Sequence, residues 1–143
     1  MVLAARDILE KEFLSLPGDK NLFEAAQQMK TNRRGFVIVM NNQGQPRGIV
    51  TEWDVLSKVV AEAKDPRSVK LEELMTKDLI TIKPNMGIDE LSLFMSTKGI
   101  RRVLVVQDEK VLGVITARTV LARLRDYVDG VSAQIARFTS PIQ

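Results

Sequence analysis

The chain carries one pattern twice, and this duplication limits the folds that it can adopt. Residues 14–40 (LSLPGDKNLFEAAQQMKTNRRGFVIVM) align without a gap with residues 80–106 (ITIKPNMGIDELSLFMSTKGIRRVLVV), an offset of 66. Apolar positions coincide, for example Leu22 with Ile88. Tandem duplication leaves such a shared order, and two copies are too few for a solenoid. We therefore expect two similar halves that pack on each other.

The alignment continues with one deletion. GIVTEWD at residues 48–54 aligns with GVITART at residues 113–119, where the offset is 65 because one residue is lost in the preceding turn. Turns tolerate such deletions. The last position of the phrase differs, since Asp54 is replaced by Thr119.

Hydrophobic periodicity predicts the order strand, helix, strand, strand, helix in each half, which is a mixed α+β fold. The predicted strands cover residues 13–16, 36–40 and 47–50, and then 79–82, 103–106 and 111–115. A half of roughly 60 residues buries little surface alone. The halves should therefore pack sheet face to sheet face with pseudo-twofold symmetry, leaving clefts between them.

The same pattern divides the chain into four parts. We assign residues 4–63 to the first repeat, 64–70 to a linker, 71–128 to the second repeat and 129–143 to a tail. Apolar residues at Val131, Ile135 and Phe138 favour a longer last helix, whereas Gly130 disfavours it.

Composition excludes several kinds of site. The 143 residues include no cysteine and no histidine, so disulfides, thiolate or imidazole metal sites and the usual general base are ruled out. Apolar residues make up 45 %, enough for a packed core. No apolar run approaches the ~20 residues of a membrane helix, and no signal peptide opens the chain. We expect a soluble, cytoplasmic protein.

The segment around Thr51 has two interpretations. In the structural one, Thr51 caps the following helix and Asp54 bonds back to the cap amide, while Gly48 marks where the strand leaves its turn. In the functional one, free backbone N–H groups and the Thr51 hydroxyl bind phosphate, and Asp54 accepts two hydrogen bonds from a ribose diol. The structural interpretation accounts for both threonines but leaves the missing acid at Thr119 unexplained.

Paired arginines precede the second strand of each half. They are Arg101 and Arg102 in the second half and Arg33 and Arg34 in the first, shifted by one or two positions. Beside a cleft, each would hold a phosphate oxygen with a charge-assisted hydrogen bond worth ~1.5–3 kcal/mol. Taken alone, such a pair is more often part of a solvated surface.

The doubled unit, the G-h-h-T-x-x-D phrase of each half and the segment ELMTKDLITIKP at residues 73–84 resemble the cystathionine β-synthase (CBS) domain pair, or Bateman module. The resemblance covers about residues 4–128. It implies a non-catalytic sensor of an adenine nucleotide such as AMP, ADP, ATP or S-adenosylmethionine, with no required cofactor. It also implies two clefts and a homodimer shaped as a flat disc.

The resemblance implies that each cleft combines both halves, with the threonine and acid of one half facing the first strand and basic residues of the other. One cleft would comprise Ile49, Thr51, Asp54, Leu79, Ile80, Thr81, Ile100, Arg101 and Arg102. The mirror cleft would comprise Leu14, Ser15, Arg34, Phe36, Val114, Thr116 and Thr119. It departs from the family pattern, because Thr119 replaces the acid and Phe36 stands opposite Arg102. We therefore expect one competent site around Asp54 and one weak or empty site.

Other functions were weighed against this sensor. No phosphate-binding loop, dinucleotide motif or G-x-S-x-G elbow is present, so an enzyme is not expected. Nucleic-acid binding is disfavoured because the net charge is only +3 and the few aromatic residues are not interleaved with the arginines.

The alternative is a dimerisation or partner-docking module with decayed ligand sites. It would bury apolar residues of the last helices against a second chain, namely Val59, Val60, Leu121 and Leu124. In either case we expect the output to pass to a separate, unidentified effector protein and no membrane to be involved.

Overall fold

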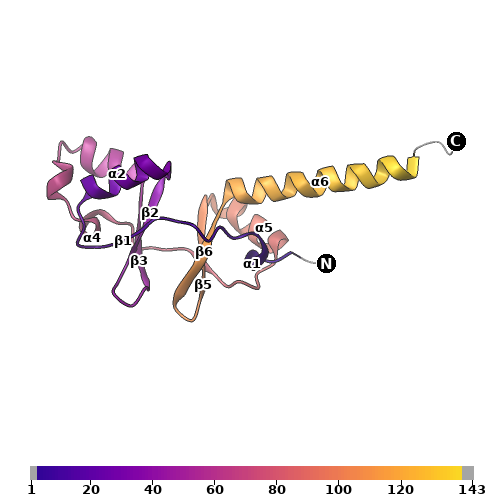
Figure 1. Ribbon diagram of the computed structural model, residues 1–143, viewed down its shortest axis with the longest axis horizontal. Helices are drawn as coiled ribbons and strands as arrows, with labels where there is room; N and C mark the ends of the chain where they lie inside the picture. The colour runs from indigo at the N-terminus through magenta and orange to yellow at the C-terminus, as the bar shows by residue number, and fades with distance from the viewer. Residues whose placement is uncertain (1–2, 140–143) are drawn as a thin grey trace.

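The computed structural model describes residues 3–139 and contains two three-stranded sheets of the same topology (Figure 1). In each sheet the first strand is parallel to the second, and the second pairs antiparallel with the third through a hairpin. The first sheet contains β1 (Ser15–Pro17), β2 (Phe36–Met40) and β3 (Pro46–Thr51). The second contains β4 (Thr81–Ile82), β5 (Arg102–Gln107) and β6 (Lys110–Thr116). The predicted mixed fold with doubled order is confirmed.

Helices connect the strands and cover the outer faces of the sheets. The first half contains α1 (Ala5–Ile8), α2 (Leu22–Asn32), α3 (Glu52–Val55) and a π-helical turn, η1 (Leu56–Val60). A 3₁₀ turn, η2 (Pro66–Ser68), leads to α4 (Leu71–Leu74), α5 (Ile88–Lys98) and α6 (Ala117–Thr139). Among residues 3–139, no helix combines the length and hydropathy needed to cross a membrane.

The inner faces of the two sheets pack on each other through one apolar cluster. Its buried centre consists of Ile38, Leu104 and Val114, with half-buried neighbours such as Phe13 and Leu79 around it. Ile38 and Leu104 occupy equivalent positions in the two halves, and so do Phe13 and Leu79. Because equivalent residues meet in one cluster, the halves are related by a pseudo-twofold axis that passes through it.

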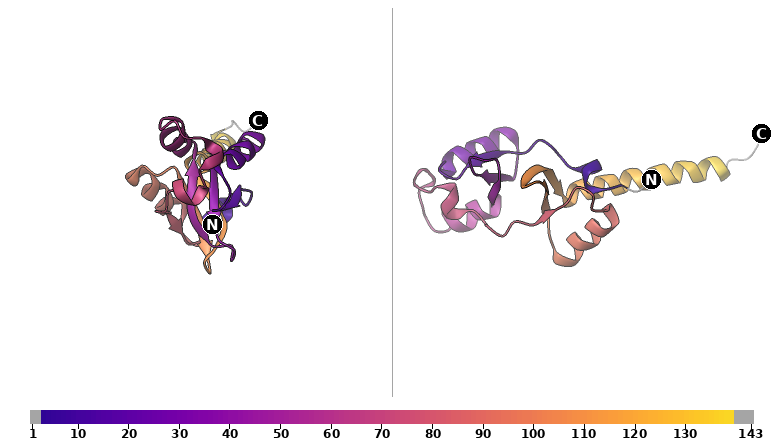
Figure 2. Two further views of the ribbon diagram at one scale, coloured as in Figure 1. Left: turned by 90° about the vertical axis from the view of Figure 1, so that its left-hand side faces the viewer. Right: turned by 90° about the horizontal axis from the view of Figure 1, so that it is seen from below.

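The first short helix of each half packs on the other half. Ala5 and Ile8 of α1 belong to the core of the second half, whereas Leu71 and Leu74 of α4 belong to the core of the first. The N-terminal segment runs along the molecule from α1, which lies beside the second half, to β1 of the first half (Figures 1 and 2). The two halves thus exchange their first short helices, which the repeat pattern did not indicate.

The two repeated glycines give this crossing segment room. A Cβ atom on Gly113 would lie 2.6 Å from the backbone oxygen of Glu10, and one on Gly48 would lie 2.6 Å from the Met75 sulfur. Gly48 therefore permits a close approach of another segment, which corrects its interpretation as the mere end of a turn.

Helix α6 continues into the predicted tail, an extension that the sequence left open. Residues 129–139 of the predicted tail continue it without a break at Gly130, because one glycine costs only ~1 kcal/mol relative to alanine in a helix. Residues 140–143 lie outside the described part. Helix α6 extends well beyond the body of the molecule (Figure 1). A further correction concerns Val59, which is buried in the first core instead of being available to a second chain.

Candidate functional site

Thr51 and Asp54 form a closed set of hydrogen bonds at the junction of β3 and α3. The Asp54 carboxylate accepts from the Thr51 backbone N–H (2.8 Å) and from the Thr51 hydroxyl (3.1 Å), both on Oδ2. In return, the Asp54 N–H donates to Thr51 Oγ1 (3.3 Å). These are the reciprocal bonds of a capping box, as the structural interpretation of this segment requires.

The other carboxylate oxygen of Asp54 is also occupied. Lys58 Nζ lies 3.0 Å from Oδ1, and the Thr76 hydroxyl donates to the same oxygen over 3.3 Å. Asp54 is only 4 % exposed and is the one charged residue that is buried among residues 3–139. Its carboxylate is therefore committed to holding β3, η1 and the segment before β4 together.

A cavity of about 280 Å³ opens beside Thr51, between the two halves. Ile49 and Thr51 line it from the first half, and the second half supplies the other walls: Asp78, Leu79, Ile80, Gly99, Ile100, Arg101, Arg102, Val103 and Leu104. Seven of the nine residues expected in this cleft are among the lining residues. The two that are not are Thr81, which is exposed on β4, and Asp54.

The predicted role of Asp54 needs a correction, because Asp54 does not line the cavity. The sequence placed its carboxylate at a ribose. Its two oxygens, however, already make four contacts within the protein, namely three hydrogen bonds and one ion pair. Within residues 3–139, Asp78 is the only carboxylate that lines the cavity, and sequence reasoning missed it. Its position directly before the predicted strand at residues 79–82 was the available signal.

The two arginines of the cavity differ in their surroundings. Arg101 is exposed, whereas Arg102 is half-buried and lies over the ring of Phe36, with 4.9 Å from Cζ to the ring centroid. Burial lowers the pKa of Arg102; the nearby carboxylate of Glu52 opposes this shift, and Arg101 adds to it. The guanidinium nevertheless stays charged at neutral pH, because arginine side chains keep their charge in proteins. The lining of the cavity thus combines two cationic side chains with several apolar ones.

The second predicted cleft contains a different network. Thr116 and Thr119 share a hydrogen bond of 2.9 Å between their hydroxyls, and the Thr119 N–H donates to Thr116 Oγ1 (3.1 Å). The Thr119 hydroxyl also donates to Glu10 Oε1 (3.1 Å), and Arg34 Nη1 lies 3.6 Å from Glu10 Oε2. Glu10 therefore joins Arg34 and Thr119, two residues that the sequence expected in this cleft.

The remaining residues expected in the second cleft lie in the strands or make contacts that hold the sheets. Val114 is buried and exchanges two backbone hydrogen bonds with Glu10, Phe36 contacts Arg102, and the Leu14 carbonyl accepts from the Ile38 N–H. Ser15 is exposed on β1.

Glu10 supplies the acid that the second half lacks at Thr119. With the offset of 66, Glu10 aligns with Thr76, and the two residues make the equivalent bridges to Val114 and Ile49. In the first half, Asp54 follows β3 and accepts a hydrogen bond from Thr76 of the segment before β4. In the second half, Thr119 follows β6 and donates a hydrogen bond to Glu10 of the segment before β1. Carboxylate and hydroxyl have exchanged places, and extending the alignment back to residue 10 would have revealed this.

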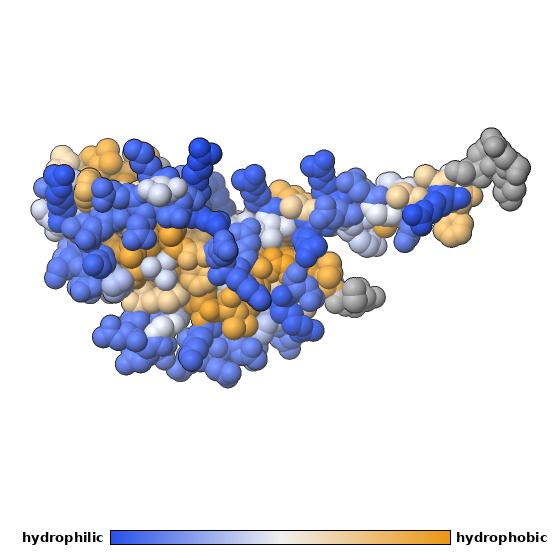
Figure 3. Space-filling model, viewed as in Figure 1, coloured by the Kyte–Doolittle hydropathy of each residue, from blue (hydrophilic) through white to orange (hydrophobic). Residues whose placement is uncertain are grey.

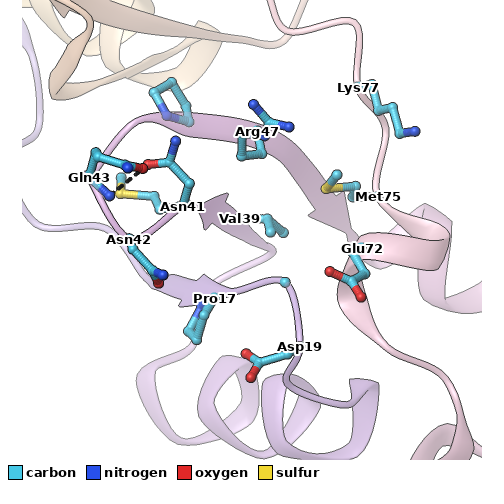
Figure 4. Close-up of a pocket in the computed structure, with 13 residues that line it drawn as sticks. Pro17, Asp19, Val39, Asn41, Asn42, Gln43, Arg47, Glu72, Met75 and Lys77 are labelled. Atoms are coloured by element: carbon cyan, nitrogen blue, oxygen red, sulfur yellow. Dashed lines mark hydrogen bonds between the residues drawn. The ribbon is translucent and has the colours of Figure 1, made fainter.

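A larger hollow of about 730 Å³ lies at the outer edge of the first half, next to the turn between β2 and β3 (Figure 4). Arg47 and Asp19 lie on opposite sides of it with Val39 between them, and Lys77 and Glu72 also line it. Two cations thus balance two acids, so this hollow has no net charge that would attract an anion. The smaller cavity beside Thr51 is therefore the better candidate for a charged ligand.

Comparison with known proteins agrees with this architecture. A family model described as the CBS domain matches residues 5–61 and 71–126. An uncharacterized protein of Methanopyrus kandleri is 30 % identical over 80 % of this chain, which spans 59 % of the length of that relative.

Solved structures show the same similarity. The CBS domain pair of protein MJ0100, in complex with 5′-methylthioadenosine and S-adenosyl-L-methionine, has a TM-score of 0.75 at 28 % identity, covering 88 % of this chain and 98 % of that one. The hexameric CBS-CP12 protein from bloom-forming cyanobacteria also has a TM-score of 0.75, at 26 % identity, covering 99 % of this chain and 88 % of that one.

Proposed function

Because the chain belongs to the CBS domain family, we propose that it is a non-catalytic regulatory module that binds an adenine nucleotide in the cavity beside Thr51. The observation that carries the proposal is the lining of this cavity, which joins a helix-capping threonine of one half to two arginines of the other. A CBS pair of similar structure, MJ0100, binds two adenosine compounds.

The cavity offers different chemistry to the two ends of a nucleotide. Ile49, Leu79 and Ile80 provide apolar walls for a base, which is flat and largely apolar on its faces. Arg101 and Arg102 provide the positive charge for phosphate, and charge-assisted hydrogen bonds of this kind contribute ~1.5–3 kcal/mol each.

The acid that meets the ribose is Asp78 in this proposal. It is the one carboxylate in the lining, and a carboxylate can accept both hydrogen bonds of a vicinal diol. Asp54 acts indirectly, since its bonds fix the position of the Thr51 hydroxyl. The volume of about 280 Å³ is just below the ~300–1,000 Å³ typical of small-molecule sites, which favours a nucleoside monophosphate over larger nucleotides.

The second cleft is the weaker one in this proposal. Its cation, Arg34, already contacts the Glu10 carboxylate, so an incoming phosphate would have to displace an acid and would be repelled by it. One strong site per chain is therefore expected.

Titration calorimetry and thermal unfolding with AMP, ADP, ATP and S-adenosylmethionine test the proposal. A ligand that binds only the folded state raises the melting temperature, by an amount equivalent to ~2.7 kcal/mol at a hundred times Kd. Arg101→Gln and Asp78→Asn should each weaken binding at least tenfold. Arg125→Gln is the matched control, because it removes the same charge from the exposed helix α6. Failure of all four compounds to bind would refute the proposal, and ATP turnover would contradict a non-catalytic role.

A docking module without a small ligand is the second candidate. Exposed apolar residues on α3 and η1 favour it, since Trp53, Leu56 and Val60 are 69 %, 51 % and 63 % exposed. Such a cluster on one short segment suits a homodimer or an effector protein. A dimer that binds none of the four compounds would support this candidate over the sensor.

A further inference from the structure

Apolar residues follow each other along α6 at alternating steps of three and four. The series consists of Leu121, Leu124, Val128, Val131, Ile135 and Phe138, which we call the α6 seam. This spacing averages 3.5 residues, the period of the apolar positions in a coiled coil, which are named a and d. Three of the six seam residues, Val131, Ile135 and Phe138, lie in the predicted tail, beyond Gly130.

The body of the protein leaves this seam open. Leu121, Leu124 and Val128 are 65 %, 55 % and 54 % exposed, and farther along Ile135 and Phe138 are 56 % and 90 % exposed. By contrast, Val120 on a neighbouring face of the same helix is buried in the core of the second half. Figure 3 shows α6 leaving the body as a rod on which apolar residues lie among hydrophilic ones.

A free helix of this kind needs a partner. Helices in proteins owe most of their stability to packing of an apolar face, and α6 extends for 23 residues, roughly 35 Å, of which only the beginning contacts the body. A seam of period 3.5 fits a helix that carries the same period, because each side chain then enters a hole between four residues opposite. The α6 seam itself has that period.

The charges beside the seam permit pairing with an identical helix. In a parallel pair, the flanking contacts would join Tyr127 to Ser132 of the second copy and Gln134 to Thr139, so no like charges meet. The charged residues Arg123, Asp126 and Arg137 occupy outer positions of the same repeat. Self-association therefore meets no electrostatic penalty along the extension.

The residue types of the seam bear on the number of helices, and the position of the two bodies bears on their orientation. Val128 and Ile135 at a positions and Leu124 at a d position follow the pattern that favours two strands in a parallel coil, whereas Leu121, Val131 and Phe138 do not. A parallel pair also keeps both bodies at the same end of the helices. We propose that α6 forms a parallel two-stranded coiled coil with α6 of a second copy of this chain, independently of any nucleotide.

Analytical ultracentrifugation of the full chain tests this association. The unaltered chain should be a dimer, and Ile135→Lys should raise the dimer dissociation constant at least a hundredfold, because it places a charge in the seam. Ala133→Lys adds the same charge on the outer side of α6, two residues away, and should leave the dimer unchanged. A monomeric chain, or a dimer that Ile135→Lys does not weaken, would overturn the proposal.

Disulfide trapping tests the orientation, since the chain has no cysteine of its own. Val131→Cys should form a disulfide with the same residue of the second copy under mild oxidation, because parallel helices place equal d positions opposite each other. Asp126→Cys, at an outer position, is the control and should not crosslink. Equal crosslinking of both variants, or none at Val131, would overturn the parallel pair.

Discussion

The guanidinium of Arg102 lies 4.9 Å from the ring centroid of Phe36, and these two residues are equivalent positions of the two halves. Each begins the middle strand of its sheet. Equivalent residues that contact each other lie next to the pseudo-twofold axis, so an arginine in both halves would bring two like charges together. The difference between the two clefts therefore begins at the axis, where only one half can supply this cation.

Phe36→Arg should destabilise the protein. The substitution removes a cation–π contact worth ~0.5–1 kcal/mol and adds repulsion against Arg102, for a total of roughly 1–3 kcal/mol. Urea unfolding measures the loss, which should shrink when salt is raised to ~0.5 M and the charges are screened. Phe36→Leu is the control, since its smaller loss should not depend on salt. A loss from Phe36→Arg that ignores salt would show that the charges do not meet.

Exchanging the carboxylate of Glu10 and the hydroxyl of Thr119 should show that the stability effects of the two positions depend on each other. Thr119→Asp places a second carboxylate beside Glu10, and Glu10→Thr removes the partner of Arg34, so each single change should destabilise the second half. The double variant recreates the arrangement of Asp54 and Thr76 in the first half. We expect the double variant to be at least ~1 kcal/mol more stable than the sum of the single losses predicts. Free energies of unfolding for the four proteins give the coupling directly, and simple additivity would speak against an exchanged pair.

Asp54→Ala should cost ~2–4 kcal/mol of folding stability. It removes the Asp54 side of the capping box and leaves the Thr51 N–H and Lys58 without their buried acceptor. Chemical denaturation measures the loss. Asp126→Ala, at an exposed position of α6, should change stability by less than ~0.5 kcal/mol. Equal effects of the two substitutions would mean that the buried network contributes little.

The two repeated glycines should differ in their tolerance of a methyl group. At Gly113 a new Cβ would meet the Glu10 backbone oxygen at 2.6 Å, and backbone cannot move without breaking the bridge between Glu10 and Val114. At Gly48 the obstacle is the flexible Met75 side chain, which can change its rotamer. Gly113→Ala should therefore lower the melting temperature clearly more than Gly48→Ala. The reverse order in thermal unfolding would show that the crossing segment is not tightly held.

Much of the candidate site was predictable because its residues belong to local patterns. Thr51 ends a strand and begins a helix, and Leu79, Ile80, Arg101 and Arg102 flank strands that the apolar runs reveal. Asp54 was different. Its residue type suits both a helix cap and a sugar, and only its neighbours Lys58 and Thr76 commit the carboxylate to the cap.

The sequence by itself determined that the protein has two similar halves of mixed fold, because strand and helix periods and the repeat depend only on the order of residues along the chain. The tertiary structure decided which half holds each short first helix, that Glu10 takes the place of the acid missing at Thr119, and that α6 continues past Gly130 with one face uncovered. These features depend on contacts between segments far apart in the chain, or on their absence, and periodicity carries no information about which distant segments meet.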